Sequence, residues 1–478
     1  MQKKRNIIVL LLDTVRAGDA AAGMPMLSRL AAHATEYTNA VSPATWTVPA
    51  HAAIFTNQRA SSIKMTARDF LATGSIDPWF TQTKFLPKNA RTLAGEMAQH
   101  GYTTSLFSNN PFLTSFTNLG TGFSRIYDLW MQSNGKYDTK LTKRVSGILK
   151  GGKKTRAKMI AASVAVSRLI PKPWVDDVYL SLRKRLDRSV ARADGTYKLD
   201  RGISDTIRSI SDYADNEYDF APQFMFINCI EAHENYPVSD SSIVQDKWLY
   251  LSGINELDER TARLFHNGYM KRLGYLDRKV SDMLGTLKSK GLLDNATVVV
   301  TSDHGQFFGE HGLLYHSLFP YDEVSKVPLI AANYENGRLA SEAESVSSNV
   351  STSSLYESLL DIASGKEDHL NGNLRASKYA VSEHLGISEG WDGQLLNMLK
   401  GRSSVAMRIY ETKQKYNMRA VAVYSGSMKL IHFFGRRQDE LYNTAKDPAE
   451  NANIIKNNRD VAHRLLNAYR LSRPLAAV

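Results

Sequence analysis

Short, almost wholly apolar runs alternate along the chain with amphipathic helical stretches, and this alternation restricts the fold more than any other feature. The first run, residues 7–12, ends at Asp13 and is followed by helical spacing over 26–33. Apolar runs of this length are typical of strands that are buried on both faces of a parallel sheet. The same step recurs where a helix over 91–100 leads into a strand over 103–107. The sequence therefore predicts an α/β fold with a large, mostly parallel central sheet and helices on both faces.

At 478 residues the chain is long enough for one large domain and a smaller one. In its middle part we expect a long helix over 267–288 and strands over 224–230, 296–301 and 327–332. Nearer the end we expect two short strands over 419–424 and 429–434 and a final helix over 458–472. We therefore predict a large domain over 1–370 and a smaller C-terminal α/β subdomain over 371–478.

Residues 130–215 interrupt this alternation, and we expect them to form a basic helical insertion. Between Lys136 and Arg201 there are 18 Lys and Arg but only 6 Asp and Glu, an excess equal to the net charge of +12 of the whole chain. Such a cluster is either a solvated helical face or a surface for an acidic polymer or a membrane. A stretch over 159–170 could lie on a membrane, but a helix packed on the parent domain is more common. We predict no specific nucleic-acid partner, and the sequence leaves the oligomeric state open.

The composition is that of an ordinary folded protein, with 43% apolar and 23% charged residues. The single cysteine, Cys229, excludes an internal disulfide and favours a reducing compartment. Three basic residues near the N-terminus precede an apolar run of only six residues, which is shorter than the core of a secretion signal. No run approaches the roughly 20 apolar residues that a membrane-spanning helix needs. We therefore expect a soluble, cytoplasmic protein.

Polar side chains follow several of the predicted strands directly. Asp13, His233 and the pair Asp303-His304 each stand where a strand ends, and Thr47 stands near the start of a predicted helix. Ligands of α/β sheets gather at the carboxyl ends of the strands, so we expect these side chains to converge. Two carboxylates, an imidazole and a hydroxyl could hold a divalent cation that activates the hydroxyl as a nucleophile. Backbone N–H groups at the helix start would favour an anion there.

Each of these residues also has a structural explanation. Asp13 could cap a loop, and Thr47 could be a helix N-cap. Asp303-His304-Gly305 could be a simple turn, because Asp and Gly are turn residues. Only their joint occurrence at strand ends favours a catalytic site over these alternatives.

Several motifs, in their order along the chain, resemble the sulfatase-like branch of the alkaline phosphatase superfamily. The strand that ends at Asp13 resembles the first strand of that family with its metal-binding aspartate. Residues 47–51, Thr-Val-Pro-Ala-His, resemble the nucleophile motif Cys/Ser-x-Pro-x-Arg. Residues 301–312, with Asp303-His304-Gly305 and Gly309-Glu310-His311-Gly312, are the strongest match, and residues 440–451 resemble the C-terminal signature.

This resemblance implies an alkaline-phosphatase-like fold and assigns roles to individual residues. The metal ligands that it implies are Asp13, Thr47, Asp303 and His304. It implies that His233 and His316 hold substrate oxygens or protonate the leaving group. Further substrate contacts are expected from Arg16, His51, Asn110 and His311.

The chain departs from the sulfatase pattern at the nucleophile. A cysteine at position 47 could be oxidised to the aldehyde hydrate that sulfate-ester hydrolases use, but Thr47 cannot be. Threonine is the nucleophile in relatives that transfer phosphoglycerol or phosphoethanolamine and in phosphodiesterases. Thr14 also replaces a second aspartate, and His51 replaces the usual arginine. We therefore expect a threonine-nucleophile member that hydrolyses phosphate monoesters or diesters through a phosphothreonine, with His316 as the general acid.

Three alternatives stay open on the sequence alone. The same residues could transfer a phosphoryl group to a sugar or lipid acceptor, or could hydrolyse sulfate esters. The chain could instead be a non-catalytic binder of an acidic partner through its basic insertion. Among metals, an Asp/Asp/His/Thr set suits manganese or zinc better than magnesium or calcium, because imidazole favours transition metals.

Overall fold

The computed structural model describes residues 4–63, 85–130 without 88 and 116, 174–177, 179–181, 199–370 without 241–242, 374, 378–387, 401, 403–435 and 437–471. In this part of the chain the main sheet has nine strands in the order β12-β2-β10-β7-β1-β6-β4-β5, with β11 paired to β10. The strands are β1 Asn6–Leu12, β2 Thr35–Tyr37, β4 Thr103–Ser108, β5 Arg125–Asp128, β6 Gln223–Cys229, β7 Asn295–Thr301, β10 Leu329–Glu335, β11 Arg338–Leu339 and β12 Glu344–Val346.

Strand β1 lies in the middle of the sheet, between β6 and β7, and runs parallel to both. All seven of its residues are buried. Its side chains alternate between two apolar cores: Ile7, Val9 and Leu11 belong to one, and Ile8, Leu10 and Leu12 to the other. This two-sided burial is the reason for an apolar run without polar alternation, and it confirms the predicted α/β fold.

The sheet is mixed rather than fully parallel. Strand β10 pairs with β7 in antiparallel register, with Ile330 opposite Val300, and β2 pairs with β10 in the same sense. Strand β10 was predicted over 327–332, but the sequence did not show whether it runs parallel or antiparallel to its neighbours. Short strands also pair outside the main sheet, namely β3 Ala40–Val41 with β13 Val350–Ser351, and β8 Phe307–Phe308 with β9 Leu314–Tyr315.

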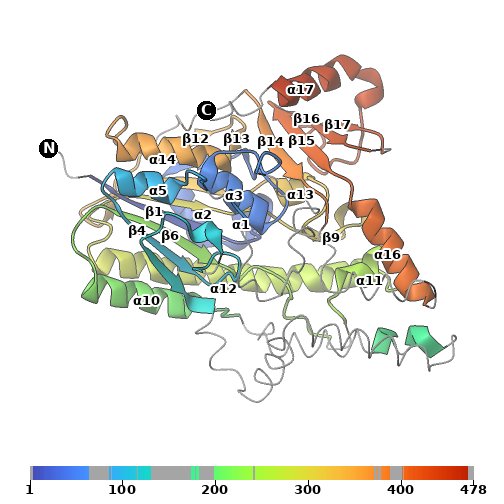
Figure 1. The fold of residues 1–478 in the computed structure, drawn as a ribbon, viewed down its shortest axis with the longest axis horizontal. Coiled ribbons are helices and arrows are strands. Elements are labelled where there is room, and N and C mark those ends of the chain that lie inside the picture. The colour runs from blue at the N-terminus through green and yellow to red at the C-terminus, as the bar shows by residue number, and fades with distance from the viewer. Residues whose placement is uncertain are drawn as a thin grey trace.

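Helices cover both faces of the sheet, as Figure 1 shows. On one face lie α3 Thr47–Thr56, α5 Leu93–Gln99 and α14 Leu355–Ala363. On the other lie α1 Ala17–Gly23, α2 Pro25–Ala31, α10 Ile203–Asn216 and α12 Glu259–Ser289. Helix α12 begins eight residues before its predicted start, because the Asp258 carboxylate accepts from the Thr261 N–H and caps it.

Helix α10 stands at the end of the segment that was expected to be an insertion. Its residues Ile203, Ile210 and Tyr213 pack in the same core as β1 and α12, so this helix is part of the main α/β domain. Strand β5 extends the sheet beyond β4 just before the basic segment. Most of the basic cluster over 136–201, including the predicted helix over 159–170, lies outside the described residues.

The C-terminal part forms a second, smaller sheet that is antiparallel throughout. Its strands are β14 Ala380–His384, β15 Ala420–Ser425, β16 Met428–Phe433 and β17 Glu440–Asn443. Helix α17, Arg459–Leu471, covers one face, while the other packs on Phe307 and Phe319 of the main domain. Other α-helices in the described ranges are α11 Lys247–Leu251, α13 Asp322–Ser325 and α16 Ser404–Tyr416. None of the helices in the described ranges is both long and apolar enough to cross a membrane.

Candidate active site and metal centre

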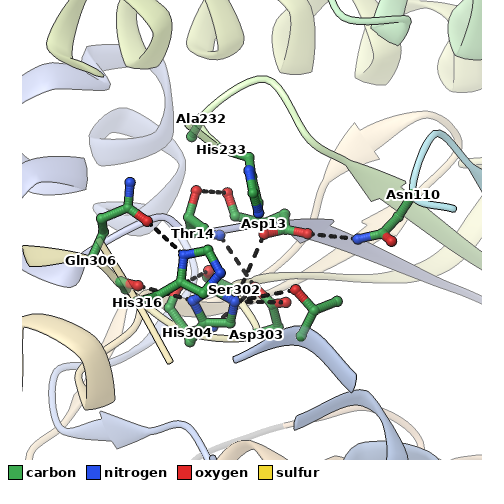
Figure 2. Close-up of polar contacts among 12 residues, drawn as sticks. Asp13, Thr14, Asn110, Ala232, His233, Ser302, Asp303, His304, Gln306 and His316 are labelled. Atoms are coloured by element: carbon green, nitrogen blue, oxygen red, sulfur yellow. Dashed lines mark hydrogen bonds and ion pairs between the residues drawn. The ribbon is translucent and has the colours of Figure 1, made fainter. Parts of the chain in front are cut away.

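Three fully buried side chains meet at the carboxyl end of the central strands. Asp13 follows β1, and Asp303 and His304 follow β7, its neighbour in the sheet. One oxygen or nitrogen atom from each lies within 4.8 Å of the others. The parallel pairing of β1 and β7 thus brings together residues that are almost 300 positions apart, as predicted, and Figure 2 shows the cluster.

Each carboxylate of this cluster has one buried oxygen that no described residue satisfies with a hydrogen bond. Asp13 Oδ1 and Asp303 Oδ2 are buried, and neither has a hydrogen-bond partner among the described residues. Burial, together with the charge of Asp303, raises the pKa of Asp13 to about 7. Burial likewise raises the pKa of Asp303 to about 7. Two such carboxylates are stabilised by a bound cation, because a buried charge has to be paired or to coordinate a metal.

His304 presents one ring nitrogen to this cluster. Its Nδ1 lies 2.9 Å from the Gly305 carbonyl oxygen, to which it donates, so Nε2 is left as an acceptor. Nε2 lies 3.5 Å from Asp303 Oδ2 and 3.9 Å from Asp13 Oδ1. A backbone-anchored imidazole beside two carboxylates is typical of a divalent metal site. The residues present therefore fit the cation that the resemblance implies.

Thr47 completes this set. It is the first residue of α3, it is only 3% exposed, and its Oγ1 lies 3.3 Å from His304 Nε2. The extended backbone of Trp46 turns the chain into the helix at this point. The hydroxyl therefore lies where a cation held by His304 and the two aspartates could contact it.

His51, which was expected to contact substrate, lies between the start of α3 and the carboxylate cluster, with its Nδ1 3.6 Å from Asp303 Oδ2. It is fully buried, and its Nδ1 donates to the Thr47 carbonyl oxygen, 2.8 Å away, one helical turn back. Its ring packs edge-on against Phe55 and Phe226. Burial lowers the pKa of His51 to about 3, so the ring is neutral. We assign His51 to positioning the start of α3.

Asn110, also expected to touch substrate, is bound to a metal-ligand candidate. Its Nδ2 donates to Asp13 Oδ2 over 2.9 Å, as Figure 2 shows. On the other carboxylate, the Thr14 backbone N–H donates to Asp303 Oδ1 over 3.2 Å. Each aspartate thus has one oxygen fixed by a donor and one oxygen left for the ion.

His233 and His316 lie together, and the His316 ring lies next to that of His304. Their ring centroids are 5.0 Å apart, and the His316 ring is 4.6 Å from that of His304 (Figure 2). Glu234, which sequence reasoning missed, lies between the two. The only local signal for it was its position directly after His233.

Two predicted substrate contacts do not join the cluster in the structure. The Arg16 guanidinium pairs with Asp19 and Glu310 instead. The His311 ring stacks on Tyr321 with centroids 3.8 Å apart and belongs to a separate acidic group on the C-terminal side. Arg16 follows Asp13 closely in sequence, and His311 follows Asp303 and His304. The side chains of Arg16 and His311 nevertheless contact other neighbours.

Comparison with known proteins agrees with this geometry. Residues 5–365 match the Sulfatase family model. The chain belongs to the sulfatase family. Its members are generally dependent on a divalent metal.

Two curated relatives share parts of the sequence. An N-acetylglucosamine-6-O-sulfatase of Bacteroides thetaiotaomicron is 28% identical over 231 residues, which cover 45% of this chain and 38% of that protein. A choline-sulfatase of Rhizobium meliloti is 32% identical over 77 residues, which cover 16% of this chain and 15% of that protein. The matches thus span well under half the length of these relatives.

Solved structures resemble the whole chain. A phosphonate monoester hydrolase of Agrobacterium radiobacter superposes with a TM-score of 0.61 at 15% identity, over 98% of this chain and 95% of that chain. A 2-O GAG sulfatase superposes with a TM-score of 0.59 at 15% identity, over 98% and 91%. At this level of identity the likeness establishes the fold, an alkaline-phosphatase-like main sheet with a smaller antiparallel subdomain.

Proposed function

We propose that this sulfatase-family enzyme hydrolyses phosphate or phosphonate esters with Thr47 as its nucleophile. The observation that carries the proposal is the position of the Thr47 hydroxyl, 3.3 Å from His304 Nε2 and beside two buried carboxylates. A threonine at this place cannot form the aldehyde hydrate, but it can attack phosphorus. The phosphonate monoester hydrolase among the structures of the same fold is consistent with phosphorus chemistry on this scaffold.

The residues that would hold the cation are Asp13, Thr47, Asp303 and His304. When bound, the cation would lower the pKa of the Thr47 hydroxyl and neutralise charge on the phosphoryl oxygens. A cation with imidazole among its ligands is manganese or zinc in preference to magnesium or calcium.

In the first step the Thr47 Oγ1, whose proton passes to solvent, attacks phosphorus in line, a P–O bond to threonine forms, and the bond to the leaving alkoxide breaks. In this proposal His233 and His316 hold the departing oxygen or give it a proton, because the His316 ring lies next to those of His233 and His304. In the second step water attacks the phosphothreonine, which returns the hydroxyl and releases phosphate or phosphonate. Asn110 and Thr14 hold the two carboxylates in place during both steps.

Sulfate-ester hydrolysis is the second candidate, because the curated relatives carry the names of sulfatases. A threonine sulfate ester has no second hydroxyl through which to eliminate, so we expect slow turnover of such esters. Transfer of the phosphoryl group to an acceptor alcohol needs the same residues, and it predicts a phosphothreonine that persists until acceptor is added. In each case the substrate is an anionic ester, and we propose that the enzyme acts in the cytoplasm.

The test is a panel of phosphate monoesters, phosphate diesters, phosphonate monoesters and sulfate esters, assayed with added manganese or zinc. Mass spectrometry of the peptide that carries Thr47 should show a gain of phosphate or phosphonate during turnover. Thr47→Ala should reduce kcat by at least roughly 10³-fold, since covalent catalysis is lost. Thr47→Ser should retain most of the wild-type kcat.

Thr56→Ala is the matched control, because this threonine lies in the same helix and bonds only to the Ala52 carbonyl oxygen, 2.7 Å away. It should leave kcat unchanged. Turnover of sulfate esters alone, with residue 47 never modified, would rule out the phosphoryl proposal. Full activity of Thr47→Ala would rule out a threonine nucleophile for any ester.

A further inference from the structure

The C-terminal subdomain contacts the nucleophile loop, residues 42–46, which leads directly into α3 and Thr47. Strand β14 is an edge strand of the small antiparallel sheet, and it bridges in parallel from Glu383 to Ala44 of this loop. The Glu383 backbone N–H donates to the Pro43 carbonyl oxygen over 2.9 Å. The backbone of the subdomain therefore pairs with the segment that carries the nucleophile.

The last residue of β14, His384, adds a side-chain bond to this loop. Its Nε2 donates to the Tyr416 carbonyl oxygen over 3.0 Å, which leaves Nδ1 as an acceptor. Burial lowers the pKa of His384 to about 4, so the ring is neutral at ordinary pH. Thr45 Oγ1 lies 3.3 Å from Nδ1 and donates to it. His384 and Thr45 are both fully buried, so bulk water cannot replace this bond.

Thr45 connects this histidine to two parts of the site. It stands two positions before Thr47, so a shift of its backbone is passed to the start of α3. Its carbonyl oxygen also accepts from the Ser317 N–H over 3.0 Å. The residues on either side of His316, Tyr315 and Ser317, both have left-handed backbone with φ of 63°. Such backbone persists only where surrounding contacts hold it, and the bond to Thr45 is one of these contacts.

We infer that His384 of the C-terminal subdomain is a positioning residue, which aligns the Thr47 hydroxyl with His316 through its bond to Thr45. The inference rests on the proposed function, because it takes Thr47 as the nucleophile. In-line attack requires the reacting atoms to meet within about 3–3.5 Å, and a displacement of about 1 Å costs roughly 10²-fold in rate. A buried hydroxyl that loses its acceptor has to find another one, and that search displaces the loop.

A purely structural role for His384 would have different consequences. Its ring packs edge-on against Phe319, with centroids 5.5 Å apart, in the core between the two sheets. Loss of this packing would lower the free energy of unfolding. It would leave the chemical step of the folded enzyme unchanged, so the rate of that step separates positioning from packing.

Two substitutions of His384 separate the two bonds of its ring. In His384→Asn, the side-chain Oδ1 takes the place of Nδ1 and can still accept from Thr45. In His384→Gln, the side-chain Nε2 takes the place of the ring Nε2 and can still donate to Tyr416, but the acceptor for Thr45 is lost. The pair therefore tests the bond to Thr45 at a single position.

The experiment measures the single-turnover rate of phosphothreonine formation by rapid quench, on the full chain loaded with Mn²⁺ or Zn²⁺. The substrate is an ester from the panel that the wild type turns over. We expect His384→Gln to slow this step roughly 10²-fold and His384→Asn to keep most of the wild-type rate. In the steady state kcat should fall while KM changes little, because the lost contact acts on the reaction and not on substrate binding.

Thr45→Val removes the same bond from the other side. It should slow the step as much as His384→Gln does, whereas Thr45→Ser should keep most of the rate. Because each change removes one shared bond, the double variant should be no slower than either single variant. The matched control is His432→Gln, the same substitution in the same sheet, at a histidine whose Nδ1 lies 2.9 Å from Asp439 Oδ2. This control should leave the rate unchanged.

The outcomes separate the inference from the proposed function. A wild-type rate in His384→Gln, or equal losses in His384→Gln and His384→Asn, would overturn the inference alone, because the rate would not follow the bond to Thr45. Additive losses in the double variant would overturn it as well. Full activity of Thr47→Ala would overturn the proposed function and the inference with it. Circular dichroism shows whether the variants fold, and Thr45→Val with Thr45→Ser decides the question if His384→Gln does not.

Discussion

Replacing Asp303 by asparagine should change stability in opposite directions with and without metal. Asp303 is fully buried, and burial raises its pKa from the ordinary 3.8 to about 7. At about 1.36 kcal/mol per pKa unit, that rise corresponds to about 4 kcal/mol of unfavourable free energy for the ionised carboxylate in the metal-free fold. Asparagine removes this charge, while its Oδ1 can still accept the Thr14 and His304 N–H groups that bond to the aspartate.

The sign of the pH dependence follows from the pKa of Asp303, which is higher in the folded protein than in the unfolded chain. The folded protein holds the Asp303 proton more tightly than the unfolded chain does. This tighter binding of the proton stabilises the folded state fully below pH 4, and the stabilisation is lost as the pH rises through 7. In EDTA, Asp303→Asn should raise the free energy of unfolding by up to about 4 kcal/mol at pH 8 and by under about 2 kcal/mol at pH 5. With metal the order should reverse, because an ion at about 10⁵ times its Kd adds about 7 kcal/mol to the wild type alone, which exceeds the gain of the variant.

Urea denaturation at pH 5 and pH 8, in EDTA and in saturating Mn²⁺, measures the change in the free energy of unfolding under all four conditions. The matched control is Asp368→Asn, an exposed aspartate that should change none of them. A variant less stable than the wild type in EDTA at pH 8 would refute the reasoning. Equal gains at the two pH values would refute it as well, because the cost would then not come from ionisation.

Three further changes test other parts of the structure. Asn110→Ala removes the donor that orients Asp13, so metal affinity measured by calorimetry should fall about 10–100-fold, and an unchanged Kd would contradict that role. Phe226→Ala should cost about 3–5 kcal/mol in urea denaturation, because the ring is fully buried; a cost below 1 kcal/mol would show that the core closes around the gap. Lys429→Met should lower stability by about 3–5 kcal/mol, since it leaves the buried Glu450 carboxylate, 2.7 Å away, without its cation; a melting temperature equal to that of the wild type would exclude this.

The central strands and the polar residues that follow them could be predicted from the sequence, because both depend on neighbouring residues. The apolar run over 7–12 that predicted the first strand lies in β1, Asn6–Leu12, and the strand predicted over 296–301 is β7, Asn295–Thr301. A run buried on both faces needs apolar residues at every position, and a ligand aspartate has to follow it directly. Asp13 and Asp303-His304 satisfied both conditions, so their meeting could be expected before the sheet order was known.

Other parts of the fold gave weaker signals. Strand β5 has only four residues, all half-buried, and the edge strands β14 and β17 are also short. The antiparallel direction of β10 depends on which edge of the sheet the chain returns to, and apolar content does not encode that choice. The start of α12 was missed because its first turns are largely polar and are set by the Asp258 cap.

The sequence by itself determined the α/β alternation, the position of two aspartates just after central strands, and a threonine at position 47 that cannot become an aldehyde. Only the tertiary structure decided which histidines share the site. It brought His233 and His316 onto one carboxylate, and it turned His311 and Arg16 toward other partners. The physical reason is the distance along the chain over which each kind of sequence signal acts. Burial and periodicity act on neighbouring residues, whereas a contact between loops after β6 and β9 depends on how the whole sheet is ordered.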